Sequence, residues 1–255
     1  MIHPTAIVHP SAKIGRSAEI GPYCLVGENV RVGAGTKLLG HVVVNGNTTI
    51  GEDTTIYPFA SIGMASQDRK AVEEVAYTTI GDRTTIREYV SIHRATGEGQ
   101  TTAVGNDCLL LAYVHIAHNC VVGNHVTMSN LAQLAGHCII EDYAGIGGMA
   151  GTHQFVRVGR HAFVGGYTKV VRDVPPYFLV DGNPAEVYGL NSAGLRRAGF
   201  PRNVLSELKD FYKAIYRSDA NLSQAIETIR ASVTTDEGRF LLAFLEADSD
   251  RGIMK

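Results

Sequence analysis

Four of the five histidines between residues 115 and 153 carry the side chains best suited to chemistry in this chain. They are His115, His118, His137 and His153. A neutral imidazole accepts a proton near neutral pH, so one of them could activate a hydroxyl for acyl transfer, a reaction that also needs a donor for the developing oxyanion. Zinc bound by His115, His118 and a third imidazole is the rival chemistry. A third possibility is that these histidines only bond backbone carbonyls at corners of the fold.

A six-residue repeat determines where these histidines lie. Every sixth residue from Ile2 to Ile62 is Ile, Val or Leu, and the same phase returns over 80–92 and 104–170. Of these 26 positions only Thr152 is not Ile, Val, Leu or Met, and glycine follows at twelve. The pattern predicts a short β segment and a tight corner, repeated along a solenoid. We expect the glycines to supply the backbone freedom that a corner needs.

The repeat resembles that of the hexapeptide-repeat family. The resemblance implies a mainly β fold, a left-handed parallel β-helix of triangular section with 18 residues per coil. Coils should stack about 4.8 Å apart. His118 is then one coil from Gly136, Asn119 is one coil from His137, and His153 is within one residue of the same line. We expect these residues on one edge, with the Gly136 N–H as a candidate oxyanion donor.

The repeat is lost over residues 63–79 and 93–103, although its phase is the same on both sides. We expect two extruded loops, each replacing a whole number of hexads. Loops on a rigid scaffold are favoured places for binding. The first loop contains Gln67, Asp68 and Lys70, which combine polar groups of both signs.

The C-terminal quarter has a different pattern. Apolar residues over 204–215 have helical spacing, Asn221 is a suitable cap for a second helix, and 236–247 indicates a third. We therefore expect a β-helix over residues 1–190 and a C-terminal α-helical domain over 191–255.

The start of the helical domain is basic within a chain of net charge −2. Only Glu207 and Asp210 oppose six basic residues, which are Arg196, Arg197, Arg202, Lys209, Lys213 and Arg217. The bias indicates either a solvated helix face or a docking surface for an acidic partner.

Composition excludes several classes of protein. The nearly balanced charge argues against a nucleic-acid-binding protein. Neither a signal peptide nor an apolar run of about 20 residues is present, so we expect a cytoplasmic protein without a transmembrane segment. The cysteines form no CxxC pair and are expected as small interior residues; they are Cys24, Cys108, Cys120 and Cys138.

A set of motifs is more specific than the repeat. The set comprises Ile92-His93-Arg94, His115-Ile116-Ala117-His118, Leu134-Ala135-Gly136-His137, His153-Gln154-Phe155, Asp173-Val174-Pro175-Pro176-Tyr177 and Gly194-Leu195-Arg196-Arg197. With these motifs, the whole chain resembles the acyl-carrier-protein-dependent UDP-N-acetylglucosamine (UDP-GlcNAc) O-acyltransferases, which begin lipid A biosynthesis in Gram-negative bacteria.

The resemblance implies transfer of a (3R)-hydroxyacyl group from acyl carrier protein to the glucosamine 3-position of UDP-GlcNAc. His118 would be the general base and the Gly136 N–H the oxyanion donor. The residues matching the substrate cleft are Gln67, Asp68, Lys70, His93, His115, His137, His153 and Gln154. Asn191 and Arg197 would reach the UDP group from the neighbouring subunit of a homotrimer. The resemblance implies no metal and no cofactor, because the donor is the phosphopantetheine thioester, and it assigns the basic helices to the acidic carrier.

Three positions depart from the family or adjust its specificity. Asn119 stands where the family has Asp, which makes the 3-amino analogue of UDP-GlcNAc a credible acceptor and N-acylation the alternative reaction. Gly166 leaves the acyl groove open, which favours a longer acyl chain, and Pro184 replaces a histidine at the far end of that groove. A γ-class carbonic anhydrase, built on the same repeat with bound metal, is a more distant alternative.

Overall fold

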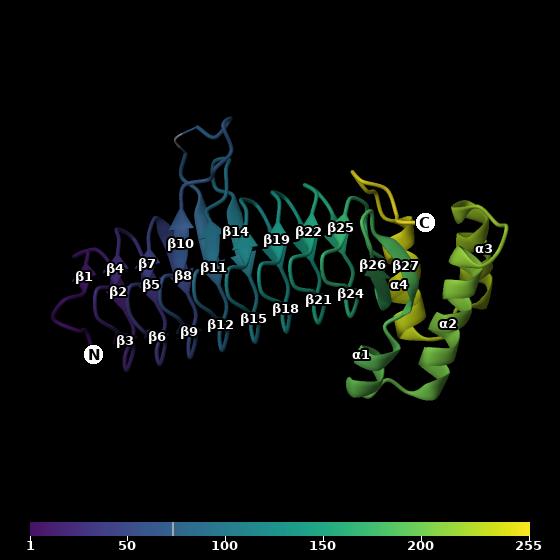
Figure 1. Cartoon of the computed structure of the whole chain (residues 1–255), viewed down its shortest axis with the longest axis horizontal. Helices are drawn as coiled ribbons and strands as arrows, with labels where there is room; N and C mark the ends of the chain where they lie inside the picture. The colour runs from purple at the N-terminus through teal and green to yellow at the C-terminus, as the bar shows by residue number, and fades with distance from the viewer. Residues whose placement is uncertain (73) are drawn as a thin grey trace.

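The computed structural model describes residues 1–72 and 74–255. The chain winds into a long prism of short strands, and four helices cover its C-terminal end (Figure 1). Three sheets form the faces of the prism, because nearly every strand pairs in parallel with the strand three places further along the chain. The predicted left-handed parallel β-helix is confirmed.

The first face consists of β1 (Ile7–Val8), β4 (Leu25–Val26), β7 (Val43–Val44), β10 (Ser61–Met64), β13 (Ser91–His93), β16 (His115–Ile116), β19 (Gln133–Leu134), β22 (Gly151–Thr152) and β25 (Lys169–Val170). The second face consists of β2 (Lys13–Ile14), β5 (Arg31–Val32), β8 (Asn47–Ile50), β11 (Tyr77–Ile80), β14 (Thr101–Val104), β17 (Val121–Val122), β20 (Ile139–Ile140) and β23 (Arg157–Val158).

The third face consists of β3 (Glu19–Ile20), β6 (Lys37–Leu38), β9 (Thr55–Ile56), β12 (Thr85–Ile86), β15 (Leu109–Leu110), β18 (Thr127–Met128), β21 (Gly145–Ile146), β24 (Phe163–Val164), β26 (Phe178–Asp181) and β27 (Glu186–Leu190). We call the edge between the first and second faces the first corner. The second corner leads from the second face to the third, and the third corner leads back to the first face.

Strand register keeps equivalent residues in line. Ile7 pairs with Leu25, 18 residues further on. Beside the two loops the step becomes 30 residues, from Ser61 to Ser91, and then 24, from Ser91 to His115. The steps exceed 18 by 12 and by 6, so each loop adds whole hexads, and the phase of the repeat is preserved.

Both loops leave the first corner, where they project together from the prism (Figure 1). Strands β10 and β11 extend into the predicted loop range 63–79, so the connection between them covers only 65–76, of which Glu73 lies outside the described residues. Strands β13 and β14 likewise reduce the second loop from 93–103 to 94–100.

Glycine has a different role at the corners from the one expected. The left-handed residue of nearly every corner is not glycine; Tyr23 (φ 56°) and Asn119 (φ 60°) are examples. A Cβ on Gly21 would instead lie 2.2 Å from the carbonyl oxygen of Leu39 in the next coil. Glycine after the aliphatic residue is therefore required mainly by the close approach of neighbouring coils, and the expectation that it supplies backbone freedom at the corner was wrong.

The interior is filled by the aliphatic residue of each hexad together with small residues. Ile56, Ile86 and Leu110 are fully buried, and the four cysteines are free and buried, as predicted. Thr152, the exception in the repeat, shares a hydrogen bond of 3.1 Å with the Cys138 thiol.

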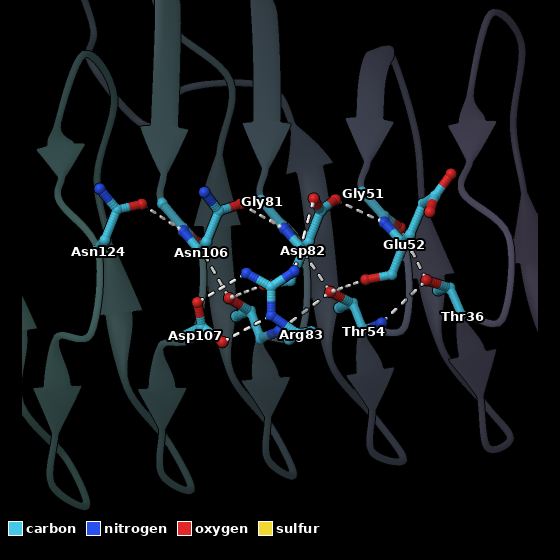
Figure 2. A network of polar contacts seen from close by, with 12 residues as sticks. Thr36, Gly51, Glu52, Thr54, Gly81, Asp82, Arg83, Asn106, Asp107 and Asn124 are labelled. Carbon is cyan, nitrogen blue, oxygen red and sulfur yellow. Dashed lines mark hydrogen bonds and ion pairs between the residues drawn. The ribbon is translucent and has the colours of Figure 1, made fainter.

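A column of threonines binds successive coils at the second corner (Figure 2). The Thr54 N–H donates to the Thr36 hydroxyl (3.0 Å), and the Thr84 N–H donates to the Thr54 hydroxyl (3.1 Å). The Thr54 hydroxyl in turn donates to the carbonyl of Gly81 (2.9 Å). Because each hydroxyl is fully used, these polar groups are satisfied although the threonines are buried.

A second column at this corner pairs backbone N–H groups with side-chain oxygens of the next coil. The Glu52 N–H donates to Asp82 (2.7 Å), the Asp82 N–H to Asn106 (2.7 Å) and the Asn106 N–H to Asn124 (2.9 Å). Each donor stands two residues after the aliphatic residue of its hexad. This position therefore presents an N–H that the turn itself does not satisfy.

The helical region begins with a short helix and ends against the prism. Its helices are α1 (Ser192–Arg197), α2 (Arg202–Tyr216), α3 (Leu222–Ser232) and α4 (Asp236–Glu246). Asn221 caps α3 through a reciprocal pair of hydrogen bonds with Gln224. The repeat does not predict α1 or the antiparallel pairing of β27 with β26. None of the described helices is long and apolar enough to cross a membrane.

Asp173 joins the C-terminal segment to the prism. Its fully buried carboxylate accepts from the Arg157 backbone N–H, from Arg157 Nε and from the Ser249 hydroxyl, all at 2.8 Å. Asp173 also pairs as a β-bridge with Ile253. One carboxylate thus connects the last coil with the end of the chain.

We expect Asp173→Ala to lower the free energy of unfolding by about 3 kcal/mol, because it leaves the largely buried Arg157 guanidinium unpaired. Urea denaturation at fixed protein concentration measures the change. Glu227→Ala, which removes an exposed pair with Arg230, is the control and should have little effect. Equal effects of the two substitutions would contradict the structural role of Asp173.

Candidate active site

The first corner brings His118 against Gly136. The His137 N–H donates to the His118 carbonyl (3.1 Å), which stacks the two coils in register. A Cβ on Gly136 would lie 2.6 Å from His118 Nε2. The imidazole therefore occupies space that any side chain at position 136 would fill, and its Nε2 faces the Gly136 backbone.

Asn119 determines which nitrogen of His118 carries the proton. The Asn119 Nδ2 donates to the Thr96 carbonyl (2.9 Å), and its Oδ1 accepts from the Thr96 N–H (3.0 Å). These contacts fix the amide orientation, because reversal would place donor against donor. Oδ1 lies 2.9 Å from His118 Nδ1, which must therefore be the donor. Nε2 is left with a free lone pair, as a general base requires.

Gly136 also presents a free backbone donor. It occupies the same position in its hexad as Glu52 and Asp82, whose N–H groups are capped at the second corner. Within residues 1–72 and 74–255, the Gly136 N–H donates to no acceptor. An uncapped N–H beside His118 Nε2 can receive an oxyanion that develops next to the base.

Other imidazoles surround the base. His93 packs edge-on against His115 (ring centroids 4.9 Å apart), and His137 packs edge-on against His118 (5.1 Å). Burial, followed by the charges of neighbouring histidines, lowers the pKa of His93 and of His137 and brings the pKa of His115 to about 4. These three rings are therefore neutral near neutral pH and contribute hydrogen bonds rather than charge.

The loop over β10 and β11 lies above this group. Asp68 is close enough to His137 to oppose the lowering of its pKa. The Asp68 carboxylate also accepts the Lys70 N–H (2.9 Å), which folds the segment into a turn. Gln67 and Lys70 are exposed, and within the described residues no hydrogen bond links either side chain to the histidines. Beside them is a cavity of about 290 Å³, lined by Asp68, Arg94 and Thr96 among others.

One coil beyond Gly136, His153 and Gln154 meet the end of the chain. Arg251 Nε donates to the Gln154 carbonyl (2.7 Å), and its Nη2 donates to His153 Nε2 (3.1 Å). The structure thus places a cation from the C-terminal segment beside two residues of the predicted substrate cleft.

Gly166 and Pro184 lie apart from His118. Gly166 is at the third corner, where a Cβ would lie 3.3 Å from the Gly148 carbonyl oxygen. Pro184 follows Asn183, which helps to line a cavity of about 420 Å³ at the C-terminal end of the first face, together with Met149 and Lys169.

Asn191 and Arg197 lie on a different side of the prism from His118. Asn191 caps α1 by accepting from the Gly194 N–H (3.1 Å), and it donates to the His161 carbonyl at the second corner (3.0 Å). Both residues line a cavity of about 660 Å³ over the third face. Within one chain, the predicted site residues therefore form two separate groups.

The ring Nδ1 atoms of His115 and His118 are engaged in hydrogen bonds. Within residues 1–72 and 74–255, no three His, Cys, Asp or Glu side chains are arranged to hold a metal ion. His115 Nδ1 shares a hydrogen bond of 2.8 Å with the Ser91 hydroxyl, and His118 Nδ1 donates to Asn119.

Comparison with known proteins identifies the family. The model of UDP-N-acetylglucosamine O-acyltransferase domain 2 matches residues 173–254, and that of the GMPPB C-terminal domain matches residues 2–97. The acyl-[acyl-carrier-protein]–UDP-N-acetylglucosamine O-acyltransferase of Synechocystis sp. is 45% identical over 198 residues, 77% of this chain and 72% of the relative. That of Burkholderia lata is 45% identical over 203 residues, 77% of each chain. This chain belongs to the UDP-N-acetylglucosamine O-acyltransferase family.

Solved members of this acyltransferase family have the same architecture throughout. The enzyme LpxA of Acinetobacter baumannii is 41% identical, with a TM-score of 0.96 over 100% of this chain and 99% of that chain. LpxA of Bacteroides fragilis is 36% identical, with a TM-score of 0.97 over the whole of both chains. These likenesses favour acyl transfer over the carbonic anhydrase alternative.

Sequence reasoning about this acyltransferase missed two residues beside its predicted site. Thr96 lies in a loop without a repeat, and Arg251 lies in a segment without regular structure, so no spacing connects either with the histidines. Only Arg251 offered a signal in the sequence: an arginine close to the C-terminus can indicate that the last segment packs back against the rest of the fold.

The lowered pKa of His115 predicts acid sensitivity. The unfolded chain binds a proton at this histidine below about pH 6.5, whereas the folded chain does so only near pH 4, so folding loses stability as the pH falls through this window. We expect His115→Gln to reduce the loss of unfolding free energy between about pH 7 and about pH 5, measured by urea denaturation.

Gln133→Ala is the matched control, because Gln133 lies directly above His115 and does not titrate. An unchanged pH dependence in His115→Gln would show that another group causes the acid sensitivity.

Proposed function

We propose that this chain transfers a (3R)-hydroxyacyl group from acyl carrier protein to the 3-hydroxyl of UDP-GlcNAc, the first step of lipid A biosynthesis. The observation that carries the proposal is the meeting of His118 Nε2 with the uncapped N–H of Gly136. A proton acceptor and an oxyanion donor then share one small space, as acyl transfer to a hydroxyl requires.

The reaction follows from this arrangement. His118 Nε2 takes the proton of the 3-hydroxyl while its oxygen attacks the thioester carbonyl, and a C–O bond forms. The resulting oxyanion accepts the Gly136 N–H. Collapse of the intermediate breaks the C–S bond, and the imidazolium returns its proton to the pantetheine sulfur. Asn119 Oδ1 accepts the Nδ1–H throughout and holds the ring in place. The proposal uses no metal and no cofactor, because the donor is itself an activated thioester.

A homotrimer would unite the two groups of site residues. Asn191 and Arg197 lie on another side of the prism from His118 and border an open cavity of about 660 Å³. In the proposed trimer, this side of one subunit faces the first corner of the next, so that Arg197 reaches the UDP group. Gly166 and Pro184 would set the acyl length at the C-terminal end of the first face, with a preference for long chains.

The basic side of the helical region is the proposed dock for the acidic carrier protein. Lys209 and Arg202 are exposed on α2, and Lys213, also exposed, is paired with Asp210 (2.8 Å). A group of exposed cationic side chains attracts an acidic partner over a distance of about 10 Å. The free cysteines support a reducing compartment, and we propose the cytoplasm.

We expect His118→Ala to lower kcat by at least about 100-fold, because no other free imidazole nitrogen faces Gly136 among the described residues. Mass spectrometry of UDP-GlcNAc incubated with acyl carrier thioesters measures the product. His41→Ala, which alters a ring stacked between Tyr23 and Phe59 at the third corner, is the control for general damage to the coil. Comparable product from His118→Ala and the control would refute the assigned base.

N-acylation of the 3-amino analogue is a second candidate reaction, and Asn119 favours it. A neutral amide orients His118 but supplies no counter-charge for the imidazolium, and within the described residues no carboxylate is hydrogen-bonded to the ring. An amine is the better nucleophile, so it needs less assistance from the base than a hydroxyl does.

Asn119→Asp should raise hydroxyl acceptance relative to amine acceptance about tenfold, since a charge-assisted hydrogen bond is roughly twice as strong as a neutral one. The substitution also turns a carboxylate oxygen toward the Thr96 carbonyl, which will cost stability. The ratio of products from competing acceptors is independent of the amount of folded enzyme, so it remains the correct measurement. An unchanged ratio would exclude the counter-charge as the basis of acceptor choice.

A further inference from the structure

Thr96 makes more contacts with the base and its neighbour than any other residue of its loop. Its N–H and its carbonyl pair with the two ends of the Asn119 amide, at 3.0 and 2.9 Å. Its hydroxyl lies 3.0 Å from Asn119 Oδ1 and 3.4 Å from His118 Nδ1. Oδ1 is an acceptor toward both groups, so the hydroxyl donates to it. The orientation of the base therefore depends on where Thr96 is held.

A carboxylate of the other loop holds Thr96 in place. The N–H of Gly97, the next residue, donates to Glu74 Oε2 (2.7 Å). A reciprocal contact runs from the Val75 N–H to Glu98 Oε2 (3.0 Å), and the Gly99 N–H donates to the Val75 carbonyl (2.8 Å). The two loops are thus fastened to each other directly beside Thr96.

Glu74 belongs to the same loop as Asp68 and Lys70, two residues expected in the substrate cleft, and we call this loop the acceptor loop. The contacts therefore form a continuous path from the acceptor loop to the base. The path runs from Glu74 through Gly97 and Thr96 to Asn119, and from there to His118 Nδ1.

We propose that Thr96 and Glu74 are positioning residues that hold His118 with Nε2 toward Gly136 and couple this alignment to the acceptor loop. The inference rests on the proposed function, in which His118 is the base. Neither residue touches the reacting atoms. Their effect is on the fraction of enzyme in which the base is aligned, so it should appear in kcat.

The side-chain part of the relay is tested by Thr96→Val, which keeps the branched shape and removes the hydroxyl. We expect kcat to fall about tenfold, while KM for UDP-GlcNAc and for the acyl carrier thioester stays within about twofold. Thr96→Ser restores the hydroxyl and should recover most of kcat. Thr36→Val is the control, because it removes a hydrogen-bonded hydroxyl that is more deeply buried than that of Thr96 and lies at the second corner. It should lower Tm without lowering kcat.

The loop contact is tested by Glu74→Ala and Glu74→Gln. Alanine leaves Gly97 unheld and should lower kcat about tenfold, whereas the glutamine oxygen can accept the same N–H and should preserve activity. Both substitutions are at a half-buried loop position outside the prism, so the coil itself should fold in each.

The pH profile of kcat/KM distinguishes a positioning role from a general loss of rigidity, because a general loss of rigidity would not shift this profile. An imidazolium N–H is a stronger donor than a neutral one, so a fixed acceptor at Nδ1 favours the protonated ring. Thr96→Val leaves that acceptor, Asn119 Oδ1, in place but removes the hydroxyl that helps to hold it against Nδ1, so the acidic limb should shift to lower pH. The other groups that face His118 are His93 and His137, with Asp68 beside His137, and the substitution leaves all three in place.

The relay is overturned if Thr96→Val retains the kcat and pH profile of the unaltered enzyme, if its loss appears only in KM, or if Thr36→Val loses as much kcat. Failure of the proposed function is distinct from these outcomes. It would appear as absence of acylated product from the unaltered enzyme, or as product formation by His118→Ala.

Discussion

Hydrogen bonds between successive coils are the interaction on which the rest of this structure depends. Each coil donates to and accepts from its neighbours, as in the bond of 3.1 Å from the His137 N–H to the His118 carbonyl. A single bond of this kind contributes only about 1 kcal/mol net, but it fixes register as well as adding stability. A slip of one residue would place every buried aliphatic residue on the surface. His118 therefore meets Gly136 because the core permits no other alignment.

This dependence explains which features could be predicted. Residues within the repeat have known neighbours once the coil length is assumed, so the stacking of His118 on Gly136 and the interior place of Cys138 follow from counting. The cap of α3 follows from Asn221 and Gln224 because its cause is local. The identity of the family follows from motifs rather than from physics, since the same repeat serves several chemistries.

Contacts made outside the repeat could not be predicted. Thr96 reaches Asn119 from a loop that lacks the six-residue repeat, so counting residues does not predict its position. Arg251 reaches His153 across 98 residues. The role of the corner glycines was also misjudged, because the sequence does not distinguish a left-handed residue from one that is crowded by the next coil. Gly21 is of the second kind.

The contrast between two corners has a wider consequence. At the second corner, aspartate and asparagine side chains cap the N–H two residues after the aliphatic residue in four successive coils; at the first corner, the same N–H of Gly136 is left open. The backbone is alike in both places. The side chains around each position therefore decide whether its N–H is capped or available for chemistry. In a protein of this architecture, a few side-chain substitutions could therefore place an active site one coil further on or at another corner, with little change in the fold.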